Sequence, residues 1–218
     1  MGERKRHRCA YCGRGIVKEA RQREHVIPRC LYPESWRNPQ VQRLTVSACS
    51  RCNNSWSDDE AHFRNMLLLS GDASVVVNEI WRTKATRSFY EIDGRKRVLD
   101  LVSKFRRARD LPGRYKIYPG KDARVRRVLR KVVRGLCYHH GLFPFVRDRQ
   151  LWVDVLREGV PAEILNLMEA GHRDPMIFRY RWGLVRREGL HSYWLLTFYE
   201  NKTFQAAVFE SVPARYRK

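Results

Sequence analysis

Arg23-Glu-His-Val-Ile-Pro28 and Ala48-Cys-Ser-Arg-Cys-Asn-Asn54 are the two stretches around which the rest of the chain is organised. Two Cys-x-x-Cys pairs frame them: Cys9, Cys12, Cys49 and Cys52. Each pair places two thiolates on one turn, so together they supply four sulfur ligands to a tetrahedral Zn²⁺ and leave no ligand position for a substrate. The sequence therefore predicts a closed, structural zinc site.

The compartment follows from the apolar segments. The chain begins Met-Gly-Glu-Arg-Lys-Arg, without an apolar leader, and its longest apolar runs, residues 66–69 and 75–77, are too short to span a bilayer. We therefore expect a soluble, cytoplasmic protein without a membrane partner. In a reducing compartment the paired cysteines favour metal ligation over disulfides.

The charge balance indicates a polyanionic partner. Forty-four Lys and Arg residues against twenty-three Asp and Glu give a formal charge of +21 over 218 residues. Such an excess exceeds what solubility requires and is typical of proteins that bind nucleic acid.

Turn and cap signals give the expected order of elements. Residues 26–27 and 44–46 are expected to be short strands, and Ser57-Asp-Asp-Glu60 opens a helix that ends before Gly71. Further helices are expected over residues 74–84, 97–109, 121–140 and 161–170. A three-stranded antiparallel meander is expected at residues 177–182, 192–199 and 203–209.

We therefore predict an α+β protein in three parts. Residues 1–8 form a basic N-terminal arm, and residues 9–71 form a zinc-pinned domain of two strands and a helix. The cysteine framework ends near residue 71, which places the domain boundary there. Residues 72–218 form a basic α+β domain that binds DNA or a protein partner.

The helix expected over residues 121–140 combines an apolar periodicity with a dense positive charge. Its basic side chains are candidate contacts to DNA phosphates: Arg126, Arg127, Arg130, Lys131 and Arg134. The alternative is a solvated helix face. Because so many like charges repel one another without a nearby anion, we favour phosphate contacts.

Glu24, His25 and Asn53 carry the candidate chemistry. In a strand-strand-helix unit pinned by zinc, the end of the first strand and the start of the helix come together. Glu24 and Asn53 would then share one oxygen-ligated divalent cation, with His25 beside it. An isolated Glu-His pair more often lies on the surface or in the core without a catalytic role. Here its position between the cysteine pairs favours the functional interpretation.

Over residues 7–70 the order Cys-x-x-Cys, Glu-His-Val-Ile-Pro and Cys-x-x-Cys-Asn resembles the HNH endonucleases, the ββα-metal nuclease family. The resemblance implies that His25 is the general base, that Glu24 and Asn53 bind a catalytic Mg²⁺ or Mn²⁺, and that the four cysteines bind structural zinc. It implies hydrolysis of DNA phosphodiester bonds by nicking or double-strand cutting. Families of this kind serve restriction and phage defence, among other roles.

This chain departs from the family pattern at the middle Asn. Leu44-Thr45-Val46 stands where that residue commonly lies, and Asn38 in the preceding loop is the alternative, so the residue that braces the base is unassigned. The rival function is a non-catalytic zinc-knuckle protein that only binds nucleic acid. RNA is an alternative substrate, and a protein partner in a multi-component system is an alternative role for residues 72–218.

Overall fold

The computed structural model describes residues 7–36, 43–70, 74–107, 115–117, 119–174, 176–187 and 189–210. Most of the predicted basic arm, residues 1–6, and the alternative bracing residue Asn38 lie outside these ranges. The described chain mixes helix and sheet and ends in an antiparallel sheet, as the α+β prediction requires.

The N-terminal segment contains the predicted order of strand, strand and helix, but the first strand is Gln22–His25 and ends before the predicted residues 26–27. Its elements are β1 (His7–Arg8), β2 (Gly15–Ile16), the 3₁₀ helices η1 (Lys18–Ala20) and η2 (Arg29–Leu31), β3 (Gln22–His25), β4 (Thr45–Ala48), α1 (Ser50–Asn53) and α2 (Ser57–Ser70). β3 and β4 pair antiparallel, with Glu24 opposite Val46 and His25 opposite Thr45. Along β4 buried and partly exposed residues alternate, because one face of the strand packs on the core.

A group of short helices follows α2. It comprises α3 (Val75–Ile80), a π-helical turn η3 (Trp81–Ala85), α4 (Thr86–Phe89), α5 (Gly94–Val102), and the strand pair β5 (Phe105–Arg107) and β6 (Tyr115–Ile117). The helix expected over residues 74–84 therefore continues to Phe89. The helix expected over residues 97–109 begins earlier and ends at Val102, because Phe105 pairs with Ile117.

α6 (Ala123–His139) is the longest helix of the described residues and follows the 3₁₀ helix η4 (Pro119–Lys121). Asp122 caps it by accepting hydrogen bonds from the backbone N–H groups of Arg124 and Val125. The sequence predicted that one side of the helix packs and that the basic residues between Arg124 and Arg134, Lys131 among them, form the other side. Instead, every residue from Lys131 to Cys137 is buried, because α6 contacts α2, β4 and the C-terminal sheet at once.

The predicted C-terminal meander is present and forms the centre of a larger sheet. The remaining elements are the 3₁₀ helix η5 (Asp148–Gln150), β7 (Leu151–Val155), α7 (Ala162–Asn166), β8 (Glu169–Asp174), β9 (Phe178–Arg187), β10 (Leu190–Phe198) and β11 (Lys202–Phe209). The strand order is β7-β11-β10-β9-β8. The helix predicted to reach residue 170 stops at Asn166, because Glu169 pairs with Trp182 of β9.

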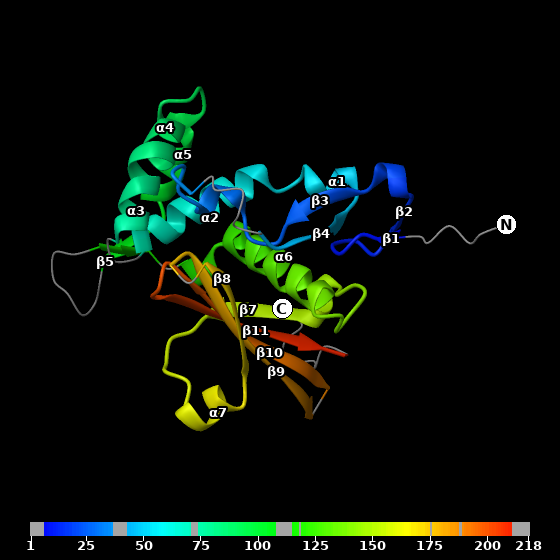
Figure 1. Cartoon of the computed structure of the whole chain (residues 1–218). Coiled ribbons are helices and arrows are strands. Elements are labelled where there is room, and N and C mark those ends of the chain that lie inside the picture. Colours follow the sequence, from blue (N-terminus) through cyan, green and yellow to red (C-terminus); the bar gives the residue numbers. More distant parts are fainter. Residues whose placement is uncertain are drawn as a thin grey trace.

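A continuous hydrophobic core runs through the described residues. It includes Val26 and Leu67 from the predicted N-terminal domain, Leu129 of α6, and Trp194 and Phe204 of the sheet. In Figure 1, α6 lies between the β3–β4 pair and the C-terminal sheet. The two predicted domains therefore share one core. No helix among the described residues is long and apolar enough to cross a membrane.

Gly135 lies where α6 passes closest to the residue that follows β3. A Cβ atom at this position would lie 2.7 Å from Cγ2 of Val26. We expect Gly135→Ala to lower the free energy of unfolding by about 1–3 kcal/mol through overpacking, measured by urea denaturation. The control is Gly159→Ala, whose Cβ enters open space. Equal effects from the two substitutions would contradict this close contact.

Candidate metal centre and active site

Four cysteines meet at one end of the β3–β4 pair. The four are Cys9, Cys12, Cys49 and Cys52, and their sulfur atoms all lie within 4.8 Å of one another. Cys12 Sγ and Cys49 Sγ are 3.8 Å apart. A tetrahedral Zn²⁺ with bonds of about 2.3 Å separates its sulfur ligands by roughly 3.8 Å, so this cluster can hold a metal ion of that size.

Backbone hydrogen bonds hold the first cysteine pair in position. The N–H of Gly13 donates to the carbonyl of Cys9 at 2.9 Å, and the positive φ of Gly13, 71°, allows the tight turn. The N–H of Ala10 donates to the carbonyl of Ser47 at 2.9 Å, which ties this turn to β4. The backbone N–H of Cys49 also points at Cys9 Sγ, at 3.4 Å. The two pairs are therefore brought together by the chain itself.

The thiols of the cluster perturb one another. Burial raises the pKa of Cys52, and the neighbouring sulfur atoms raise it further. Burial opposes ionisation of Cys49 too, but hydrogen bonds from the backbone of Cys52 and from the other thiols lower its pKa to about 7. Metal ligation requires thiolates, so a cation bound by the four sulfur atoms would favour ionisation of these crowded thiols.

We expect the purified protein to contain about one zinc per chain and Cys49→Ser to unfold at a lower temperature than wild type, because a closed zinc site contributes folding energy directly. Metal analysis and thermal denaturation with and without a chelator measure the two quantities. Cys137→Ser is the control, since Cys137 is buried and does not belong to the cluster. Chelator should lower the melting temperature of this variant no more than it lowers that of wild type. Zinc-free, fully folded protein would refute the assignment.

Glu24 is buried on β3 and faces α6. Lys131 Nζ donates to Oε1 of Glu24 and to Oε1 of Glu60 in α2, and the Lys131 side chain is 0% exposed. The rings of Tyr11 and Trp56 enclose the same ammonium group, with centroids 5.9 and 5.8 Å from Nζ. Lys131 is therefore the internal counterion of two carboxylates, and its burial removes it from a surface that contacts phosphates.

The predicted basic face of α6 is smaller than the sequence indicated. Arg134 is buried like Lys131 and bonds to the carbonyl of Val146 and the carboxylate of Asp148. Arg127 is exposed and pairs with Asp59 at 3.1 Å, while Arg126 and Arg130 are half-buried. Of the five predicted residues, those that remain candidates for phosphate contacts are Arg126, Arg127 and Arg130.

The carboxylate of Glu24 has one oxygen free for a ligand. Burial raises its pKa, and the adjacent Lys131 ammonium opposes this shift by favouring the ionised form. Lys131 contacts only Oε1, and no hydrogen bond or ion pair involves Oε2 among the described residues. The geometry is therefore compatible with a divalent cation on Oε2.

His25 ends β3 with an unused ring nitrogen. Nδ1 is buried and makes no hydrogen bond to the described residues. Burial lowers the pKa of His25 to about 4, and nearby positive charges, led by Arg29 and Arg43, add to the shift. The imidazole is therefore neutral at pH 7, and the same burial and nearby cations make it a weaker base than an exposed histidine.

Asn53 lies on a neighbouring element, because α1 contacts β3. The sequence placed Asn53 at the start of the long helix, whereas it is the last residue of the single turn α1. Its Oδ1 is buried without a hydrogen-bond partner among the described residues, and its Nδ2 donates to Oδ1 of Asn54 at 3.3 Å. A buried carbonyl oxygen without a donor is available as a ligand to a cation.

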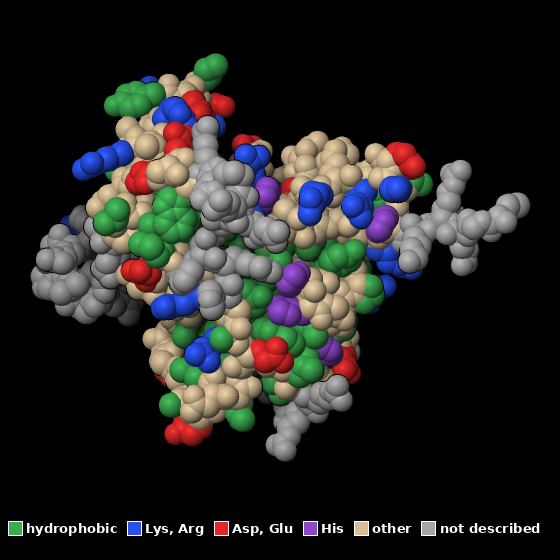
Figure 2. Space-filling model, in the orientation of Figure 1, with side chains coloured by type: hydrophobic (Ala, Val, Ile, Leu, Met, Phe, Trp, Pro, Cys, Tyr) green, Lys and Arg blue, Asp and Glu red, His purple; other side chains and the backbone are tan. Residues whose placement is uncertain are grey.

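Sequence reasoning missed the cations around His25. Arg23 and Arg29 are exposed and Arg43 is half-buried, and all three are close enough to His25 to lower its pKa. Figure 2 shows Lys and Arg side chains gathered over the β2–β4 region, with histidines beside them. A signal for the internal role of Lys131 was present in the sequence, since it lies three residues after Val128 and four before Gly135, the spacing of a buried helix face.

Known proteins supply no further constraint. No protein-family model, curated protein or solved structure matches the chain. The site is therefore interpreted from its own geometry.

We expect Lys131→Met to lower the free energy of unfolding by about 3–5 kcal/mol, because it leaves Glu24 and Glu60 as uncompensated buried carboxylates. If Glu24 binds a divalent cation, added Mg²⁺ or Mn²⁺ should restore part of the loss in thermal denaturation. Lys96→Met is the control, since Lys96 is 85% exposed and its one ion pair within the described residues is with Asp93. An identical response of wild type and both variants to Mg²⁺ would argue against a metal at Glu24.

Proposed function

We propose that the protein is a metal-dependent DNA endonuclease of the HNH type, which hydrolyses phosphodiester bonds with His25 as general base. The observation that carries the proposal is the neutral imidazole of His25, whose buried Nδ1 has no partner among the described residues. It stands beside Glu24 on a strand that contacts α1 and its unpartnered Asn53 oxygen. A base, a carboxylate and an amide oxygen are the groups that metal-assisted hydrolysis needs.

Each residue of the proposed site has one role. His25 accepts a proton from the water that attacks phosphorus. Glu24 and Asn53 hold Mg²⁺ or Mn²⁺, which when bound offsets negative charge on the phosphate and on the leaving 3′ oxygen. Zn²⁺ bound by Cys9, Cys12, Cys49 and Cys52 fixes the turn and α1 relative to β3.

The substrate would be held by positive charge. Arg23, Arg29 and Arg43 are close enough to His25 to lower its pKa, and Arg126, Arg127 and Arg130 lie on α6. Contacts of this kind bind the nucleic-acid backbone without reading its sequence and lose strength as salt rises.

One feature favours the rival function, a zinc-knuckle protein that binds nucleic acid without cutting it. Lys131 already neutralises Glu24, so the carboxylate has a cation without any metal. A fixed ammonium at this place would keep the fold intact in a protein that had lost catalysis. The two functions differ in whether His25 is needed for any reaction.

We expect His25→Ala to retain the melting temperature and DNA affinity of wild type and to lose about 10²- to 10⁴-fold in Mg²⁺-dependent cleavage rate, the usual effect of removing a positioned base. Supercoiled plasmid is the substrate, because nicked and linear products separate single-strand from double-strand cutting, and a structured RNA serves in a parallel reaction.

His139→Ala is the matched control, since it removes an exposed histidine at the end of α6. Its cleavage rate should equal that of wild type. Undiminished cleavage by His25→Ala would refute the assigned base, and absence of cleavage by the zinc-loaded wild type with Mg²⁺ and with Mn²⁺ would favour the binding protein.

A further inference from the structure

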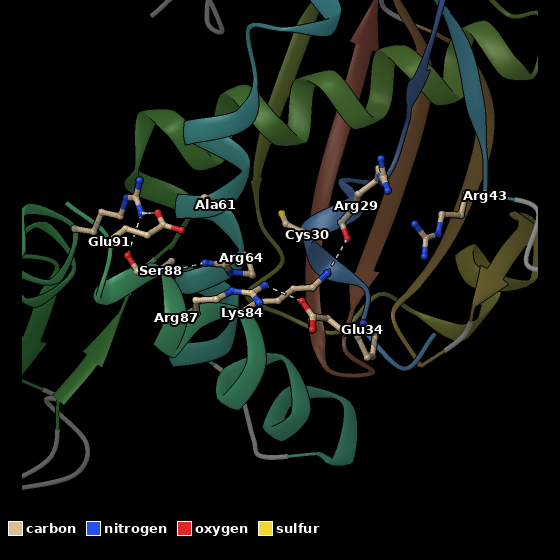
Figure 3. Close-up of a pocket in the computed structure, with 12 residues that line it drawn as sticks. Arg29, Cys30, Glu34, Arg43, Ala61, Arg64, Lys84, Arg87, Ser88 and Glu91 are labelled. Atoms are coloured by element: carbon tan, nitrogen blue, oxygen red, sulfur yellow. Dashed lines mark hydrogen bonds and ion pairs between the residues drawn. The ribbon is translucent and has the colours of Figure 1, made fainter. Parts of the chain in front are cut away.

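A pocket with an excess of positive charge lies between η2 and the helices α2 to α5. Its volume is about 550 Å³, and six cationic and two acidic side chains line it, a net of four positive charges. The cations are Arg29, Arg43, Arg64, Lys84, Arg87 and Arg97. Figure 3 shows Arg64, Lys84 and Arg87 grouped on one side and Arg29 and Arg43 on the other, so the lining comes from segments far apart in the sequence.

Both acidic side chains of the pocket are already neutralised. Glu34 pairs with Arg87 at 2.7 Å, and Glu91 pairs with Arg97. Arg29, Arg43, Arg64 and Lys84 have no carboxylate partner among the described residues. An anion that enters would therefore meet unpaired cations and no free carboxylate.

Arg64 is the least expected of these cations. It is 5% exposed, and its hydrogen bonds go to neutral groups, Oδ1 of Asn65 and Oγ of Ser88, each at 3.0 Å. Burial lowers the pKa of its guanidinium. A buried charge is costly unless an opposite charge compensates it, so this arrangement is most stable when an anion occupies the pocket.

Lys84 and Arg43 are positioned by backbone oxygens rather than by charge. Lys84 Nζ donates to the carbonyl of Tyr32 at 2.7 Å, and Nη2 of Arg43 donates to the carbonyl of Trp36 at 3.3 Å. Such bonds fix the direction of a cation and leave its charge uncompensated. The pocket is thus preorganised for an anionic ligand.

We propose that this pocket binds a phosphate group carried by a nucleotide, either free or at the 5′ end of an unpaired strand. Guanidinium groups match phosphate oxygens in geometry and charge. The volume falls within the range of small-ligand pockets, ~300–1,000 Å³, which admits a nucleotide and excludes a double helix. The strand-end source rests on the proposed function, because Arg29 and Arg43 belong both to this pocket and to the surroundings of His25.

The test is equilibrium binding by calorimetry to full-length, zinc-loaded protein without added Mg²⁺, so that no cleavage is required. The probes are adenosine 5′-monophosphate against adenosine, and a 5′-phosphorylated single-stranded tetranucleotide against its 5′-hydroxyl form. We expect the phosphate to tighten binding roughly tenfold or more in at least one pair. If the phosphate tightens binding of the mononucleotide, the ligand is a free nucleotide. If it tightens binding of the tetranucleotide alone, the ligand is a strand end.

Arg29→Ala and Arg64→Met should abolish this difference, and Arg82→Ala should retain it. Arg29 is exposed, so we expect its loss to change stability little, and Arg82 is an exposed arginine on η3 outside the pocket. Arg64→Met should melt no lower than Arg82→Ala, since it removes an uncompensated buried charge. Equal affinity for phosphorylated and unphosphorylated probes, or equal weakening by Arg82→Ala and Arg29→Ala, would overturn the proposal. The proposed nuclease function fails separately, through undiminished cleavage by His25→Ala.

Discussion

The buried ammonium group of Lys131 is the interaction on which the rest of the structure depends. It is fully enclosed and bonded to carboxylates from two other elements, Glu24 of β3 and Glu60 of α2. A lone charge in this position would cost several kcal/mol, so the fold is stable only when α6, β3 and α2 meet here. The strand with the candidate base is therefore held by the helix at the centre of the chain.

This constraint changes how the site is organised. The zinc framework alone would place Cys49, α1 and β4, but the direction of Glu24 is set from α6. The ammonium partner opposes the rise in the pKa of Glu24 that burial causes, and the second carboxylate oxygen has no partner among the described residues. In a nuclease, the pair of Lys131 and Glu24 would position a metal ligand. In a protein that only binds nucleic acid, the ammonium group would take the place of the metal.

Four cations of the pocket have no carboxylate partner among the described residues: Arg29, Arg43, Arg64 and Lys84. Arg29 and Arg43 connect the surroundings of His25 with the pocket that contains Arg64 and Lys84. In the same pocket Arg87 is compensated by Glu34, and Arg97 by Glu91. An uneven distribution of this kind draws anionic ligands towards the uncompensated side, which joins the proposed nucleotide pocket to the proposed nuclease site.

Local chemistry in the sequence determined the two cysteine pairs, the helix that starts at Ser57, the long helix after Asp122 and the three aromatic strands, because turn, cap and periodicity signals act over a few residues. Contacts between distant elements decided the rest. β8 (Glu169–Asp174) carries a weak local signal and becomes a strand by pairing with β9, whereas β7 has strand-favouring Trp and Val residues and joins the sheet by pairing with β11. Lys131 has the spacing of a buried helix face, three residues after Val128, but only the packing of α6 on α2, β4 and the C-terminal sheet shows that it is enclosed. The partner of Glu24 lies 107 residues away in sequence, and a pattern of neighbouring residues carries no information about so distant a contact.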